Sequence, residues 1–306
     1  MNNFTHNSVL LTESINALNI KKDGIYIDGT FGRGGHTLAI AKELTTGKII
    51  AFDKDLDAIN YAKENLKSDN IEVVHSDFAN MYKILESKKL IGKIDGILLD
   101  LGVSSPQLDD KNRGFSFTGD NPLDMRMDKT QDLDATGLLK NSTEEEIANI
   151  IYRYGDERRS RIIAKKIKEF QLDNDLNTTK QLADIVCSVV QKTGKKHPAT
   201  RTFQALRIHI NSELVSLENF LNSSIEILKK NGRLSIITFH SLEDRIVKKF
   251  IKENSQAKQV PKNMPFLNVD EVFLPLKAIK KIKPNKNEID NNIRSRSSIL
   301  RIAEKC

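Results

Sequence analysis

Cysteine is scarce in this chain, and long hydrophobic runs are absent. The 306 residues include only two cysteines, Cys187 and Cys306, which are too few for a disulfide framework or a cysteine-based zinc site. No apolar run approaches the ~20 residues of a membrane span, and residues 1–7 lack the basic region and apolar core of a signal peptide. We therefore expect a cytoplasmic protein with no membrane partner and no metal.

The overall composition is that of a folded protein with a moderate basic excess. Hydrophobic residues make up 39% and charged residues 29% of the chain, which excludes an intrinsically disordered protein. The 48 lysines and arginines exceed the 41 acids by 7, which permits nucleic-acid binding without demonstrating it. Eight of the basic residues lie between Lys277 and Arg301. That segment is either a solvated, mobile loop or a surface that contacts an RNA backbone.

The most informative segment is Asp28–His36, a carboxylate followed by a glycine-rich turn. It directly follows Ile25–Ile27, an apolar run typical of a strand, and so predicts the first strand and cofactor loop of an α/β nucleotide-type fold. Glycines such as Gly34 and Gly35 allow a tight turn and a close approach of a ligand to the backbone. An Asp at the strand end would repel the pyrophosphate of a dinucleotide, whereas S-adenosylmethionine (SAM) has no phosphate and carries cationic groups. The sequence therefore favours SAM.

Three further apolar runs end in or near an acid and are predicted as strands: Lys48–Asp53, Ile71–Phe78 and Ile94–Asp100. The carboxyl ends of parallel strands form the ligand crevice of such folds. Together with Asp28, the acids Asp53, Asp77 and Asp100 would suit a cationic nucleoside, and Asp53 has the spacing of an acid that binds ribose hydroxyls. Each Asp alone could equally serve a turn or a helix N-cap.

A block of helical patterns separates the fourth strand from a fifth, Arg233–Phe239. Capping-box spacings mark helix starts at Thr143 and Thr178. A long apolar pattern from Phe203 to Leu228 predicts one helix that ends at Asn231-Gly232.

These patterns predict two domains. Residues 1–112 and 213–306 would form a discontinuous, Rossmann-like α/β sheet domain, and residues 113–212 an inserted, all-helical domain. A sheet of this kind supplies chemistry but little surface for a structured RNA, so we expect the insert to recognise the substrate.

The segment after the fourth strand, Asp100–Gln107, contains Ser105-Pro106. Amino-group methyltransferases have a short polar-Pro loop at this topological position. There a side-chain oxygen and a backbone carbonyl accept hydrogen bonds from the two N–H groups of a base amine. These hydrogen bonds localise the nitrogen lone pair, which is otherwise delocalised into the ring. Proline stiffens such a loop, although the aromatic expected at its end is missing and a plain turn is the alternative. The candidate catalytic residues are Asp100, Ser105, Pro106 and His240, which follows the fifth strand and could instead bond to a neighbouring loop.

Basic and aromatic residues near the domain junction are candidates for holding RNA. Phe115 could stack on an unpaired base, and Arg113 and Arg126 could hold phosphates. Equally, Phe115 could pack between the domains and Arg126 could pair with a neighbouring Asp. A second basic group has the same two interpretations and comprises Lys195, Lys196 and Arg201.

The chain resembles bacterial small-subunit ribosomal RNA cytosine-N4 methyltransferases over nearly its whole length. The segments that carry the resemblance are His6–Leu11, Asp28–His36, Asp95–Leu108, Arg113–Asp128, His197–Glu213 and Thr238–Arg245. The resemblance implies a class I SAM-dependent methyltransferase that modifies N4 of a cytidine in the decoding region of 16S ribosomal RNA, within the small ribosomal subunit. It also implies cofactor contacts, with Phe78 on the adenine and Asp53 on the ribose. The implied contact residues are Gly34, Gly35, His36, Asp53, Phe78, Asp100 and Gln107.

Two features depart from the family. Leu138 stands where some relatives have Trp, a residue that this chain lacks, and residues 263–293 fit the family poorly. Other function classes are weaker. A nicotinamide dehydrogenase would need a phosphate-tolerant loop, against which Asp28 argues, and a non-catalytic RNA-binding module would leave the cofactor loop and Ser105-Pro106 unexplained. The sequence leaves open whether the chain forms a homodimer.

Overall fold

The computed structural model describes residues 8–192, 197–257 and 274–306. Contacts divide the chain into two compact units: unit 1 is residues 1–102 and 214–306, and unit 2 is Val103–Glu213. Unit 2 thus begins at Val103 rather than at residue 113. The physical reason is that Val103 and Leu108 pack against the hydrophobic core of the helical unit.

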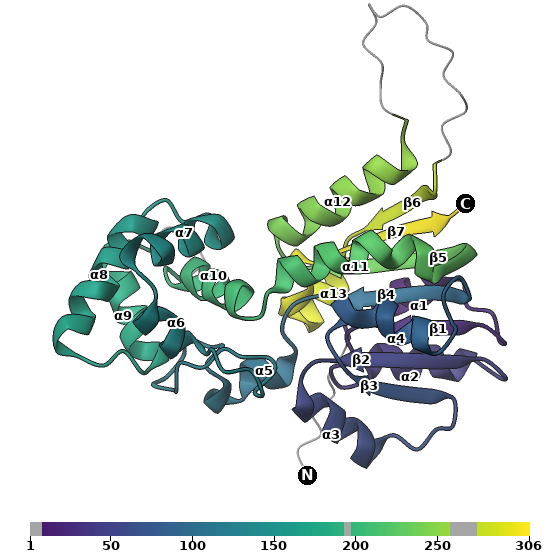
Figure 1. Ribbon diagram of the computed structural model, residues 1–306, viewed down its shortest axis with the longest axis horizontal. Helices are drawn as coiled ribbons and strands as arrows, with labels where there is room; N and C mark the ends of the chain where they lie inside the picture. Colours follow the sequence, from purple (N-terminus) through teal and green to yellow (C-terminus); the bar gives the residue numbers. More distant parts are fainter. Residues whose placement is uncertain (1–7, 193–196, 258–273) are drawn as a thin grey trace, which may run out of the picture. The chain divides into compact units, whose positions relative to one another are not determined.

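Unit 1 is built on one seven-stranded sheet (Figure 1). Its strands are β1 (Ile25–Asp28), β2 (Lys48–Asp53), β3 (Ile71–His75), β4 (Ile94–Asp100), β5 (Leu228–Thr238), β6 (Leu276–Ile282) and β7 (Ile299–Lys305). Their order is β3-β2-β1-β4-β5-β7-β6, and β7 runs antiparallel to both of its neighbours. Because β1 pairs with β2 on one side and β4 on the other, the carboxyl ends of β1 and β4 mark the position where such sheets bind ligands. The Rossmann-like prediction is confirmed.

Both faces of the sheet are buried at its central strands. Along β4, Leu99 belongs to a cluster with Phe220, whereas Leu98 belongs to a second cluster with Ile40. The helices of unit 1 are α1 (Leu11–Leu18), α2 (Gly35–Glu43), α3 (Leu56–Asn65), α4 (Met81–Ser87), α11 (Glu213–Ile227), α12 (Ser241–Ser255) and α13 (Lys286–Asn291), with 3-10 turns η1 (Phe78–Asn80) and η3 (Ile293–Ser297). Strands buried on both faces are continuous apolar runs, which is why the sequence predicted the limits of β2 and β4 correctly.

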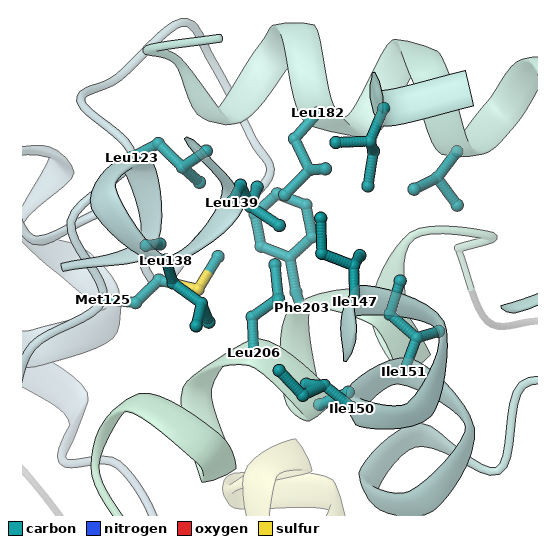
Figure 2. Close-up of a cluster of buried hydrophobic side chains, with 14 of the residues drawn as sticks. Leu123, Met125, Leu138, Leu139, Ile147, Ile150, Ile151, Leu182, Phe203 and Leu206 are labelled. Atoms are coloured by element: carbon teal, nitrogen blue, oxygen red, sulfur yellow. The ribbon is translucent and has the colours of Figure 1, made fainter. Parts of the chain in front are cut away.

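Unit 2 is helical. Its elements are α5 (Ser105–Asp109), η2 (Lys111–Arg113), α6 (Ala135–Asn141), α7 (Glu144–Gly155), α8 (Ser160–Asp173), α9 (Thr179–Val189) and α10 (Thr200–Ile210). The predicted capping boxes at Thr143 and Thr178 are confirmed. Figure 2 shows the core that these helices share, in which Ile147, Leu182 and Phe203 meet. Within the described part of the chain, no helix is both long and apolar enough to cross a membrane.

The long helix predicted from Phe203 onward is wrong. The structure divides it into α10 and α11, and Ser212 between them has a left-handed backbone with φ of 50°. Both helices bury apolar residues, so the apolar periodicity continues across the break. The predicted helix end at Asn231-Gly232 is also wrong, because α11 ends at Ile227 and those two residues lie within β5.

The basic C-terminal stretch is ordered where the structure describes it. It contains β6, α13 and η3, which corrects the solvated-loop alternative. β6 is an edge strand whose exposed residues include Lys277, Lys280 and Lys281. Lysines on an edge strand hinder pairing with the strand of another molecule.

Candidate functional site: the carboxyl ends of the parallel strands

Asp28, at the end of β1, is turned into the protein. Its side chain is buried, and its carboxylate accepts a hydrogen bond from the Thr30 backbone N–H at 3.0 Å and one from the Thr37 hydroxyl at 2.7 Å. Asp28 therefore ties the glycine-rich turn to the first turn of α2. This corrects the view that its carboxylate faces a ligand, although its charge still acts on neighbouring acids.

The glycines of the turn satisfy local steric demands. Gly34 has φ of 77°, and a Cβ placed there would lie 2.7 Å from the ring of Phe31. A Cβ at Gly35 would lie 1.9 Å from the hydroxyl of Ser8. Both positions thus require glycine for the packing of the turn itself, whether or not a ligand also approaches the backbone.

Asp53, at the end of β2, retains the ability to bind a ligand. Its Oδ2 accepts a hydrogen bond from Gly32 N–H, and its Oδ1 accepts one from Asp55 N–H, both at 2.8 Å. Burial, opposed by these hydrogen bonds and assisted by the charges of Asp55 and Asp28, raises the pKa of Asp53 to about 6. Each carboxylate oxygen has a further lone pair, so this fixed carboxylate can still accept hydrogen bonds from hydroxyl groups.

Asp100, at the end of β4, has an unsatisfied oxygen. Its Oδ1 is buried and has no hydrogen-bond partner among the described residues. Burial first, and then the charges of Asp28 and Glu243, raise the pKa of Asp100 well above its usual value. A buried carboxyl oxygen without a hydrogen-bond partner is unfavourable, and a cationic or hydrogen-bond-donating ligand would remove that cost.

His36 connects Asp100 to the N-terminal segment. The ring is buried, with Nε2 3.1 Å from the carbonyl oxygen of Val9 and Nδ1 3.7 Å from Oδ2 of Asp100. Donation from Nε2 to Val9 leaves Nδ1 on the side of the carboxyl group. The backbone N–H of Leu10, the next residue, donates to Glu288 at 2.6 Å. His36 therefore has the geometry of a residue that positions Asp100.

The remaining strand-end acid, Asp77, is occupied within the protein. Its carboxylate accepts hydrogen bonds from Ala79 N–H, the Ser216 hydroxyl and the Lys54 ammonium, at 2.8, 3.0 and 3.2 Å. The next residue, Phe78, packs edge-on against Phe220 with ring centroids 5.9 Å apart and is partly exposed. The four acids predicted to act together thus divide into two structural residues, Asp28 and Asp77, and two with capacity for a ligand.

His240 caps α12. Its Nδ1 accepts a hydrogen bond from Glu243 N–H at 3.4 Å, and its Nε2 lies 3.1 Å from Oε1 of Glu243. Glu243 is buried and accepts a hydrogen bond from Phe239 N–H at 2.8 Å. Sequence reasoning missed Glu243, whose negative charge contributes to the raised pKa of Asp100. The spacing of a capping box, His240 to Glu243, is the signal that could have identified it.

In unit 2, the Ser-Pro segment is helical rather than a loop. Ser105 and Pro106 occupy the first turn of α5, where proline loses no hydrogen bond. Ser104 is the N-cap, and its N–H donates to Oε1 of Gln107 at 2.9 Å. Gln107, which the family resemblance gave as a cofactor contact, is buried and completes this capping box.

Two of the predicted RNA-binding residues are buried inside unit 2, which corrects their assignment. Arg113 is only 3% exposed, and its guanidinium donates to the carbonyl oxygens of Met127 and Arg126 at 2.9 and 3.1 Å. Phe115 belongs to the core cluster of the unit. A buried guanidinium that holds main-chain oxygens shapes the loop and does not reach a phosphate.

Arg126 also acts within the protein. Its guanidinium forms a two-pronged pair with Asp124 at 2.8 and 2.9 Å and donates to the carbonyl oxygen of Gln131 at 2.7 Å. Although burial opposes it, this pairing lowers the pKa of Asp124. Of the second basic group, Arg201 is exposed and lies 3.6 Å from Glu157, while Lys195 and Lys196 lie outside the described residues.

Comparison with known proteins identifies the family. The model of the MraW methylase family matches residues 3–306. The chain belongs to the MraW methylase family. It is 55% identical over 301 residues to the ribosomal RNA small subunit methyltransferase H of Vesicomyosocius okutanii, with 98% of each chain covered. It is 50% identical over 306 residues to the protein of that name from Francisella tularensis subsp. novicida, covering 98% of this chain and 99% of the relative. An rRNA methylase structure from Streptococcus thermophilus is similar with a TM-score of 0.40 at 13% identity, covering 96% of this chain and 93% of the other.

Membership of the MraW methylase family confirms the predicted class I fold and SAM as the cofactor. The residues at the strand ends fit this cofactor. Asp100, with one buried oxygen that has no hydrogen-bond partner among the described residues, suits a positively charged ligand, and Asp53, a fixed carboxylate with spare lone pairs, suits a ribose. A polyphosphate would meet the negative charges of Asp53 and Asp100 at these positions.

Proposed function

We propose that this MraW methylase transfers a methyl group from SAM to N4 of a cytidine in the decoding region of 16S ribosomal RNA. The observation that carries the proposal is the pair Asp53 and Asp100, two fixed carboxyl groups with unused lone pairs beside a glycine-rich turn. The RNA substrate follows from the name of the relatives, ribosomal RNA small subunit methyltransferase H, and the choice of N4 from the resemblance carried by the sequence motifs. An enzyme with this substrate would work in the cytoplasm.

The two carboxyl groups would hold opposite ends of the cofactor. Asp53 would accept hydrogen bonds from the ribose hydroxyls, and Phe78, which is partly exposed, would pack on the adenine. Asp100 would pair with the ammonium of the methionine part, held in place by His36. When bound, SAM supplies a methyl group on a positively charged sulfur, which makes that carbon electrophilic.

Ser105 would prepare the amine of the base. Among the described residues its hydroxyl has no partner, and it sits in the first turn of α5, where Pro106 restricts the backbone. A serine oxygen and a main-chain carbonyl that accept hydrogen bonds from the two N–H groups would localise the nitrogen lone pair for attack on the methyl carbon. As the new N–C bond formed, the bond between that carbon and the sulfur would break, and the surplus proton of the amine would pass to water. Positioning of this kind can account for most of the acceleration of a transfer between two bound groups. His240 would contribute indirectly, by fixing Glu243 near Asp100.

The direct test is methyl transfer from labelled SAM to purified ribosomal subunits. We expect label in small subunits from a strain that lacks this methylase and none in large subunits. The Asp100→Asn variant is the matched negative control. Labelling of large subunits alone, or of no RNA, would contradict the proposal. Calorimetric titrations with SAM and with NAD distinguish this proposal from the dehydrogenase alternative. A dehydrogenase would bind NAD and would not bind SAM.

A further inference from the structure

Arginine is concentrated where α7 meets α8. Four of the nine residues from 153 to 161 are arginines. α7 packs against both α8 and α10, and α10 brings a fifth arginine, Arg201, to the same place. The backbone of Arg201 lies close to Gly155, since a Cβ on that glycine would be 2.7 Å from the Arg201 carbonyl oxygen. The Arg201 guanidinium also donates a hydrogen bond to the Asp156 carbonyl oxygen at 3.4 Å. We name this group the arginine corner, and its members are Arg153, Arg158, Arg159, Arg161 and Arg201.

Two members of the arginine corner hold it together. Arg159 donates a hydrogen bond to the carbonyl oxygen of Val189, at the end of α9. Arg201 lies 3.6 Å from the carboxylate of Glu157, which is buried and also accepts a hydrogen bond from the backbone N–H of Arg159 at 3.0 Å. The corner is therefore a built structure and not a set of independent side chains.

Two other members are exposed and available. Arg158 and Arg161 are solvent-exposed, and neither has an ion-pair or hydrogen-bond partner among the residues that the structure describes. By contrast, the exposed Lys165 and Lys166 further along α8 both contact Glu169, at 3.8 and 2.7 Å. Among the described residues of this segment, the arginines without a partner thus lie at the start of α8, whereas the lysines further along share Glu169.

The surroundings do not neutralise the arginine corner. Its five arginines are accompanied by two acids in the turn before α8, Asp156 and Glu157, which leaves an excess of three positive charges. The α10 segment packed against α7 contains no acid, and the acids of α7 lie in its first turn, at the opposite end of that helix. An anionic partner is the electrostatic complement of this surface.

The arginines do not serve the helix that they precede. α8 begins with Arg159 as its N-cap, without a side-chain capping hydrogen bond and without an acid in its first turn. Cations at a helix N-terminus oppose the helix dipole, so this arrangement is unfavourable for α8 itself. Guanidinium groups match the geometry of phosphates with two parallel hydrogen bonds, and the exposed Tyr152 nearby on α7 adds a ring on which an unpaired base can stack.

We propose that Arg158 and Arg161, supported by Arg159 and Arg201, bind phosphates of the substrate RNA backbone. This inference rests on the proposed function, because it assigns the RNA contacts of the same enzyme. It moves the recognition surface away from the buried Arg113 and the paired Arg126 to the corner between α7 and α8.

The test compares two double variants that each remove two positive charges, one at the start of α8 and one further along it. Arg158→Gln/Arg161→Gln removes two unpartnered arginines, and Lys165→Gln/Lys166→Gln removes two lysines that already have a partner. Binding of each protein to a 16S ribosomal RNA transcript is measured from about 0.05 to 0.3 M salt. Each lost phosphate contact should reduce the slope of the logarithm of the binding constant against the logarithm of the salt concentration by about 0.7–0.9. The loss of two contacts therefore corresponds to an affinity about 25- to 60-fold weaker near 0.1 M salt.

We expect this loss for the arginine variant only, with SAM affinity and the circular dichroism spectrum unchanged in both variants. Equal effects of the two variants, or no effect of either, would overturn the inference, as would wild-type binding that does not depend on salt. Methyl transfer to small subunits by the wild type is measured separately. Its absence would count against the proposed function, whereas its presence with unaltered RNA binding by the arginine variant would count against the arginine corner alone.

Discussion

Replacing Asp53 with Asn should change both the strength and the pH dependence of SAM binding. In the free protein the pKa of Asp53 is raised to about 6, mainly by burial. Ribose hydroxyls donate hydrogen bonds to the ionised carboxylate, so binding requires the proton to leave. Apparent affinity should therefore fall as the pH drops below about 6, since an increasing share of the free protein holds that proton.

The magnitude follows from that pKa. Protonation of Asp53 weakens the apparent affinity for SAM by a factor of one plus ten to the power of pKa minus pH. With a pKa of about 6, this factor is about 11 at pH 5 and about 1.1 at pH 7, so the affinity should change about tenfold between these two pH values. Loss of hydrogen bonds to a charged acceptor costs about 1.5–3 kcal/mol. Asp53→Asn should therefore bind SAM about 10- to 150-fold more weakly at pH 7 and lose the part of the pH dependence that Asp53 causes.

Isothermal titration calorimetry at pH 5, 6 and 7, in two buffers of different ionisation enthalpy, measures both the affinity and the protons released. At pH 6, Asp53 should contribute about half a proton per SAM bound, and the variant should release that much less. The exposed Asp69, replaced with Asn, is the matched control and should behave like the wild type. If Asp53→Asn keeps the affinity, the pH profile and the proton release of the wild type, Asp53 does not bind the ribose.

Three further variants test other residues. Asp100→Asn should weaken SAM binding by about 1.5–3 kcal/mol and remove the proton release that persists in Asp53→Asn, because burial and neighbouring acids raise the pKa of Asp100 in the free protein; unchanged calorimetric titrations would refute this role. Gly34→Ala should destabilise the folded protein by more than about 1 kcal/mol, because φ is 77° and the new Cβ meets Phe31; thermal unfolding without SAM measures this, and an unchanged midpoint would show that the turn can adapt. Arg126→Ala should cost about 1.5–3 kcal/mol of stability at pH 7 with RNA affinity retained. Pairing lowers the pKa of Asp124, so the stability that the pair contributes is present above the unfolded-state pKa of Asp124 and is lost as the pH falls through its folded-state pKa. The urea unfolding curves of the variant and the wild type should therefore converge in acid. A difference in stability that persists in acid would contradict the ion-pair explanation.

The strands that carry the site were predictable because burial leaves a simple signature. β2 and β4 are buried on both faces and therefore contain the apolar runs Ile49–Phe52 and Ile97–Leu99, each of which is followed by an Asp. The glycine-rich turn between β1 and α2 was equally predictable from the sequence. These features depend on neighbours in the sequence and on the period of a strand, which a single sequence contains.

The separate roles of the four acids were not predictable. Asp28 and Asp77 look like Asp53 and Asp100 in sequence, since each ends or follows a strand. Only the fold shows that Thr37 reaches the carboxylate of Asp28, or that Lys54 and Ser216, far apart in the chain, reach that of Asp77. The same limit applies to arginine: nothing in the sequence near Arg113 indicates that its guanidinium is buried.

Breaks between helices were another limit. The apolar pattern from α10 into α11 continues across Ser212, whose left-handed backbone separates a helix of unit 2 from one of unit 1. Periodicity reports that a residue is buried but not in which core it is buried. The run of arginines before α8 was visible in the sequence, yet its meaning depends on the partners that α7, α9 and α10 provide or fail to provide.

The central claim is transfer of a methyl group to N4 of one cytidine in small-subunit RNA. The most direct measurement is mass spectrometric mapping of nuclease-digested 16S ribosomal RNA from cells with and without this protein, with the methylated nucleoside identified against authentic standards. The account predicts one methyl group, on N4 of a single cytidine in the decoding region, that is present with the wild-type protein, reduced with Asp100→Asn and absent from cells without the protein. A methyl group on C5 or on the ribose of that cytidine, on another base, or an identical map in both cells would contradict it.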